Sequence, residues 1–139
     1  MDLEASRRGV LIITDDIGFA TAATALSSPD LAVSHAHAEE AMATARAGVA
    51  DLLAIDTDSV VDAGALIAAL SLVTRSLVVA VAHQAWPGSD AASAWLRAGA
   101  DAVLPKPSGT CSPSLAGADR EAYAEWFVAL ARSLRRDAP

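Results

Sequence analysis

Short runs of apolar residues recur along the chain, and each is separated from the next by a segment with helical spacing. Val10–Ile13, Leu52–Ile55 and Leu77–Val81 are unbroken apolar runs. A strand that is buried on both faces has this composition, whereas a strand with one wet face alternates apolar and polar residues. Strands of this kind joined by helices predict a parallel sheet that is covered by helices on both faces. The expected fold class is therefore α/β, with a doubly wound five-stranded parallel sheet.

The whole pattern divides into alternating strands and helices with short connections. Glycines that follow helical segments, Gly48 and Gly99, are typical helix ends, and Ser89 or Asp90 is expected to cap the segment after Gly88. One domain is expected over residues 1–139, with a core of about 9–135 and no effector domain. The expected strands are Gly9–Thr14, Leu31–His35, Ala50–Asp56, Ser76–Ala82 and Ala100–Leu104, and the expected helices are Ile17–Leu26, Ala38–Ala47, Asp62–Leu72, Ala91–Ala98 and Asp119–Arg135.

Composition excludes several classes of function. The formal net charge of −7 argues against nonspecific nucleic-acid binding, which needs a basic face. Cys111 is the only cysteine, so neither an internal disulfide nor a zinc site made of several cysteines can form. The N-terminus lacks a signal-peptide pattern, and no apolar run approaches the roughly 20 residues of a membrane span. We expect a cytoplasmic protein with no membrane contact.

Charged residues follow the strands at one edge of the expected sheet. Asp15 and Asp16 follow the first strand, Asp56 ends the third, and Lys106 follows the fifth. Ligands bind at the carboxyl ends of strands in open parallel sheets. Neighbouring carboxylates repel or recruit a cation, and oxygen ligands of this kind suit Mg²⁺. A carboxylate nucleophile with a divalent metal and a lysine makes a phosphoryl-acceptor site. Asp16 is equally compatible with a simpler role as the N-cap of the next helix.

These motifs resemble those of response-regulator receiver domains, the CheY-like superfamily, over essentially the whole chain. The resemblance is carried by the segments Leu11–Asp16, Asp51–Asp56 and Gly99–Pro107. The ending Lys106-Pro107-Ser108-Gly109 is most similar to receivers of the chemotaxis methylesterase type. The resemblance implies a (βα)5 flavodoxin-like receiver fold with the strand order 2-1-3-4-5.

The resemblance also implies a role for each of the charged residues. Asp56 would be the phosphoacceptor, and Lys106 would pair with the phosphoryl group. Asp16 would bind Mg²⁺ directly, Asp15 mostly through water, and Asp58 through its backbone carbonyl. Apart from transferring the phosphoryl group to itself and losing it again, such a domain is not an enzyme.

The sequence departs from the receiver pattern at positions that normally relay phosphorylation. Strand four ends in Ala82, where receivers have a threonine or serine hydroxyl, and Val103 replaces the aromatic switch residue. His83 is expected at the mouth of the site, where it would shield or bind the phosphoryl group unless it is simply an exposed loop residue. Asp58 and Gln84 occupy the positions that tune dephosphorylation in the family, and solvated loop residues would look the same.

The expected function is a single-domain response regulator of a two-component system or phosphorelay. A histidine kinase or phosphotransfer protein would donate the phosphoryl group, and a downstream protein would bind through the fourth and fifth helices, with a homodimer left open. The first alternative is a pseudo-receiver, an interaction module with weak or absent switching. A second alternative, a flavodoxin-like ligand binder, is weakened because the turn Asp15–Gly18 contains one glycine and no phosphate-cradling loop.

Overall fold

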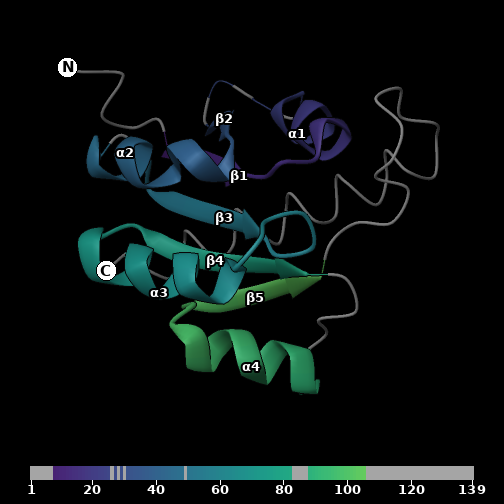
Figure 1. The fold of residues 1–139 in the computed structure, drawn as a ribbon. Helices are drawn as coiled ribbons and strands as arrows, with labels where there is room; N and C mark the ends of the chain where they lie inside the picture. The colour runs from purple at the N-terminus through teal and green to yellow at the C-terminus, as the bar shows by residue number, and fades with distance from the viewer. Residues whose placement is uncertain are drawn as a thin grey trace.

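A computed structural model describes residues 8–25, 27, 29, 31–48, 50–82 and 88–105. The strands in this part of the chain form one five-stranded sheet in the order β2-β1-β3-β4-β5, and all the pairings are parallel (Figure 1). The predicted fold class and strand order are therefore confirmed. The strands are β1 (Arg8–Ile13), β2 (Leu31–Ala36), β3 (Leu52–Asp56), β4 (Leu77–Ala82) and β5 (Ala102–Pro105).

The connections between the strands are helical, as the sequence predicts. They are α1 (Ile17–Thr24), the 3₁₀ turn η2 (Ala38–Glu40), α2 (Ala41–Arg46), α3 (Ala63–Val73) and α4 (Asp90–Ala98). The Ser89 side chain caps α4 by accepting a hydrogen bond from the Ala92 N–H at 3.1 Å. The expected helix Asp119–Arg135 lies outside the described residues.

Two layers of apolar side chains cover the two faces of the sheet. On one face Phe19, Ala22 and Ala23 of α1 pack against alternate residues of the strands, among them Val10, Ile12, Leu52 and Ala54. On the other face α2 and α3 pack against the intervening strand residues, among them Leu11, Leu53, Ile55 and Ala80, and Trp95 of α4 lies against the same cluster. The central strand β3 is buried along its whole length, because neighbouring strands flank it and helices cover it.

Several elements begin later than predicted, and an acidic side chain accepts a hydrogen bond from a backbone N–H at each of these starts. The carboxylate of Asp51 accepts a hydrogen bond from the Gly9 N–H at 2.8 Å, and β3 begins after it. In the same way the Asp101 carboxylate accepts from the Val78 N–H at 2.8 Å, and β5 begins after it. The predicted start of the second helix is a 3₁₀ turn, where the Glu40 side chain accepts from the His37 N–H at 3.3 Å.

The packing of α1 can be tested at Phe19, whose side chain is 0% exposed. Phe19→Ala should lower the free energy of unfolding by about 3–5 kcal/mol, because it removes a buried ring and leaves a cavity. Ile17→Ala is the matched control on the same helix, since Ile17 is 69% exposed; its change should stay within about 0.5 kcal/mol. Urea unfolding of both variants measures the difference, and equal midpoints would show that α1 does not pack on the sheet as described.

Candidate functional site

The Asp56 carboxylate is buried at the carboxyl end of the central strand. Its exposure is 0%, although its side chain is polar. The hydroxyl of Thr14 donates to Asp56 Oδ2 at 2.8 Å, and the N–H of Asp58 donates to Oδ1 at 3.2 Å. Burying a carboxylate costs free energy unless hydrogen bonds compensate for the lost water, and these two donors compensate one oxygen each.

The loop after β3 holds this carboxylate in place. The Ser59 and Val60 N–H groups donate to the backbone carbonyl of Asp56 at 3.3 and 3.1 Å, so the chain turns sharply after the strand. Thr57 anchors the turn on β4, because both its N–H and its hydroxyl donate to the Val81 carbonyl, at 2.9 and 3.0 Å. This turn aims the Asp58 N–H at the carboxylate.

The Asp16 side chain caps α1. Its Oδ1 accepts hydrogen bonds from the N–H groups of Gly18 and Phe19, at 3.0 and 3.3 Å. These amides belong to the first turn of the helix and have no partner within the helix, so the carboxylate stabilises the helix start. The simpler of the two roles that the sequence left open for Asp16 is therefore present in the structure.

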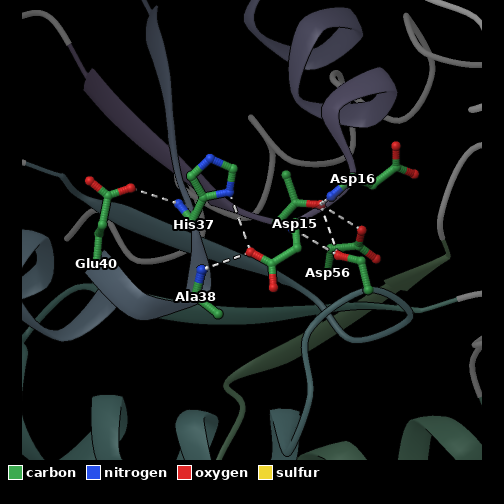
Figure 2. A network of polar contacts seen from close by, with 8 residues as sticks. Asp15, Asp16, His37, Ala38, Glu40 and Asp56 are labelled. Atoms are coloured by element: carbon green, nitrogen blue, oxygen red, sulfur yellow. Dashed lines mark hydrogen bonds and ion pairs between the residues drawn. The ribbon is translucent and has the colours of Figure 1, made fainter.

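The Asp15 side chain ties β1 to the segment after β2. Its Oδ1 accepts from the Ala38 N–H at 3.1 Å and lies 3.4 Å from His37 Nδ1. Figure 2 shows this carboxylate turned toward His37 and Ala38 rather than toward Asp56. Both side chains are partly exposed, so the pair itself contributes little to stability.

The acidic side chains that the sequence brings to one edge therefore point to different partners (Figure 2). Within the part of the chain that the structure describes, no group of three or more histidine, cysteine or acidic side chains could hold a metal ion. Asp15, Asp16 and Asp56, as placed, do not form such a group. In the observed conformation Oδ1 of Asp15 and Oδ1 of Asp16 each accept hydrogen bonds from backbone N–H groups.

The two positions that depart from the receiver pattern lie on β4 and β5. Ala82 is 3% exposed and ends β4, where it pairs with Pro105 and offers only a methyl group. Val103 pairs with Ala80 and packs, half-buried, against the cluster that includes α3. The other residues assigned to the site from the sequence, His83, Gln84 and Lys106, lie outside the described residues.

Three side chains at this edge have no role there that the sequence predicts. Thr14 and Ser59 join their hydroxyls at 3.0 Å beside Asp56, and His37 contacts Asp15. The sequence predicts Thr14 only as the last residue of a strand and Ser59 only as part of a loop. The available signal was the position of Thr14 directly after an apolar run, where its side chain reaches the same edge as the carboxylates.

The chain shares its architecture with solved receiver structures. The response regulator domain of Thermotoga maritima CheB superposes with a TM-score of 0.74 at 18% sequence identity, covering 93% of this chain and 97% of that one. CheY6 of R. sphaeroides, solved in complex with the P1 domain of CheA3, gives a TM-score of 0.65 at 27% identity, covering 94% and 96%. A CheY-like protein from Pseudomonas aeruginosa, TadZ, gives 0.57 at 21% identity, covering 96% and 97%.

Sequence comparison alone finds less: no family model matches the chain, and no curated protein matches it significantly. The structural matches nevertheless span nearly the full length of both partners. They agree with the five-stranded parallel sheet described above. The chain has the CheY-like response-regulator receiver fold.

Proposed function

We propose that this chain is a response-regulator receiver that accepts a phosphoryl group on Asp56 and signals through protein contact. The observation that carries the proposal is the buried Asp56 carboxylate at the carboxyl end of the central strand, oriented by Thr14 and Asp58. A carboxylate held by a hydrogen bond on each oxygen is preorganised as a nucleophile.

The phosphoryl donor is proposed to be a histidine kinase or a histidine phosphotransfer domain. The support is the likeness to CheY6, which was solved bound to the P1 domain of CheA3. In the reaction the histidine N–P bond breaks and its electron pair stays on the ring nitrogen, while an Asp56 oxygen forms the new O–P bond. Lys106 is proposed to pair with the phosphoryl oxygens.

The proposed output is a protein partner that binds over α4 and the helix expected at residues 119–135. The acidic net charge disfavours nucleic acid as a direct target. Within the described residues, no helix is long and apolar enough to cross a membrane. A cytoplasmic location agrees with the lone cysteine, because structural disulfides mark oxidising compartments.

Mg²⁺ is proposed as the cofactor because the receiver fold typically binds it and the nearby carboxylates are hard oxygen ligands. When bound, a divalent cation would neutralise charge on the phosphoryl oxygens. In the observed conformation Asp16 caps α1, so cation binding would compete with the helix cap. We therefore expect weak binding.

Substitutions of the acid pair, Asp15 and Asp16, distinguish the helix-capping role of Asp16 from its proposed role in binding a cation. Asp16→Asn keeps a good N-cap residue while removing the charge, so the stability should stay within about 0.5 kcal/mol of the parent. Its Mg²⁺ affinity should fall more than that of Asp15→Asn, because Asp16 is the proposed direct ligand. Titration of Mg²⁺ followed by NMR measures both affinities. Equal affinities in the parent and in both variants would contradict the assignment.

Phosphorylation itself is the direct test of the proposal. The protein is mixed with acetyl phosphate and Mg²⁺, and intact-protein mass spectrometry follows the added phosphoryl group. We expect labelling of the parent and none of Asp56→Asn, because the substitution removes the nucleophile. Asp51→Asn is the matched control, since Asp51 lies at the opposite end of the same strand and should not change labelling. An unlabelled parent would contradict the proposal.

A pseudo-receiver is the second candidate, and Ala82 is the observation that favours it. A buried methyl group ends β4 where a hydroxyl would have to bind the phosphoryl group. A two-state domain responds only to contacts that differ between its states. Without this contact, and with Val103 in place of a ring, phosphorylation would bias the β4–α4 region weakly.

Restoring the hydroxyl should restore the response. Ala82→Thr adds a charge-assisted hydrogen bond to the phosphoryl group, typically about 1.5–3 kcal/mol, while leaving the acid pair untouched. We expect larger beryllofluoride-induced NMR shifts in α4 than in the parent, with Mg²⁺ affinity nearly unchanged. Ala82→Val is the control, since it adds similar bulk without a donor. Full-scale shifts in the parent, with no gain in Ala82→Thr, would show that switching is not weakened.

A further inference from the structure

A pair of hydroxyls lies directly against the Asp56 carboxylate on the β1 side. Thr14 is 0% exposed, and its Oγ1 is 2.8 Å from Asp56 Oδ2 and 3.0 Å from Ser59 Oγ. Two backbone amides complete the group, since the Asp16 N–H donates to Thr14 Oγ1 and the Asp15 N–H donates to Ser59 Oγ, each at 3.0 Å. The threonine is thus the contact between the acceptor and the acid pair.

The number of hydroxyl protons determines which group donates in each of these hydrogen bonds. A threonine hydroxyl has one proton, and Thr14 donates it to Asp56. Thr14 must therefore accept in its contact with Ser59, so the Ser59 hydroxyl is the donor there. Ser59 in turn accepts from the Asp15 N–H. Every donor points toward the carboxylate, and hydrogen bonds aligned in this way strengthen one another.

We propose that Thr14 is a positioning residue that stabilises the unphosphorylated carboxylate and thereby shortens the lifetime of the phosphoryl group. This inference rests on the proposed phosphorylation of Asp56. In this proposal the O–P bond forms at Oδ1, and Oδ2, which accepts the hydrogen bond from the buried Thr14 hydroxyl, becomes the carbonyl oxygen of the acyl phosphate. A neutral carbonyl is a weaker hydrogen-bond acceptor than a carboxylate.

Hydrolysis reverses that change in charge. Water attacks phosphorus, the Oδ1–P bond breaks, and its electron pair returns to Asp56, while both protons of the water leave on the released phosphate. Negative charge therefore grows on the carboxylate in the transition state. The hydrogen bond from the Thr14 hydroxyl is stronger to this developing carboxylate than to the neutral carbonyl of the acyl phosphate. It therefore lowers the barrier to hydrolysis. Because Ser59 donates to Thr14, it contributes in the same direction at one remove.

The test measures how fast the phosphoryl group is lost. The full chain is phosphorylated with acetyl phosphate and Mg²⁺, the donor is removed, and mass spectrometry follows the loss. Thr14→Val removes the donor at similar volume and should lengthen the lifetime about fivefold. Thr14→Ser should restore the parental lifetime. If Thr14→Val only damaged the fold, less of this variant would be labelled. In that case Thr14→Ser would not return the rate of phosphoryl loss to the parental value.

Two further variants complete the design. Thr24→Val is the matched control, because it removes a threonine hydroxyl that bonds the Ala20 carbonyl at 2.9 Å within α1 and does not contact Asp56; its lifetime should equal that of the parent. Ser59→Ala should lengthen the lifetime by about twofold, and it decides the matter if Thr14→Val does not fold.

The two possible failures are distinguishable. If the parent loses the phosphoryl group as slowly as Thr14→Val, the role of Thr14 is overturned and the proposed phosphorylation of Asp56 stands. The same conclusion follows if Thr14→Val does not fold and Ser59→Ala loses the group at the parental rate. A parent that is never phosphorylated overturns both this inference and the proposed function.

Discussion

The structure depends on keeping one carboxylate, Asp56, out of water at the end of the central strand. Charge in this position is costly unless hydrogen bonds replace the lost solvent. The replacements come from two different segments, the residue after β1 and the loop after β3. The hydrogen bonds to Asp56 therefore hold these two segments close to each other. The same contacts fix the orientation of the carboxylate.

The acid pair after β1 has structural duties that any ligand must overcome. Asp16 begins α1, and Asp15 attaches β1 to the start of η2. Releasing either carboxylate leaves backbone amides without an acceptor, which costs free energy. A cation at this edge would therefore be linked energetically to the start of α1 and to the segment after β2.

The two sides of Asp56 differ in the side chains that they present. Toward β4 the central strand meets Val81 and then Ala82, whose apolar side chains offer no hydrogen-bonding group. Toward β1 it meets the hydroxyl of Thr14, which is joined to Ser59 and to the amides of Asp15 and Asp16. Hydrogen bonds respond to charge on the acceptor, whereas methyl groups do not. The side-chain hydrogen bonds described between Asp56 and a neighbouring strand segment therefore lie on the β1 side.

The sequence by itself determined the layers of the fold, because unbroken apolar runs between helical segments can be buried only in a parallel sheet covered on both faces. It also placed Asp15, Asp16 and Asp56 at one edge, since parallel strands end together. Only the tertiary structure decided the partners of these acids. Thr14 and Asp56 are 42 residues apart, and their hydrogen bond depends on the alignment of β1 with β3. Periodicity predicts which face a residue occupies but not which distant side chain it contacts there. The contact of the Thr14 hydroxyl with Asp56 could therefore not be predicted from the sequence.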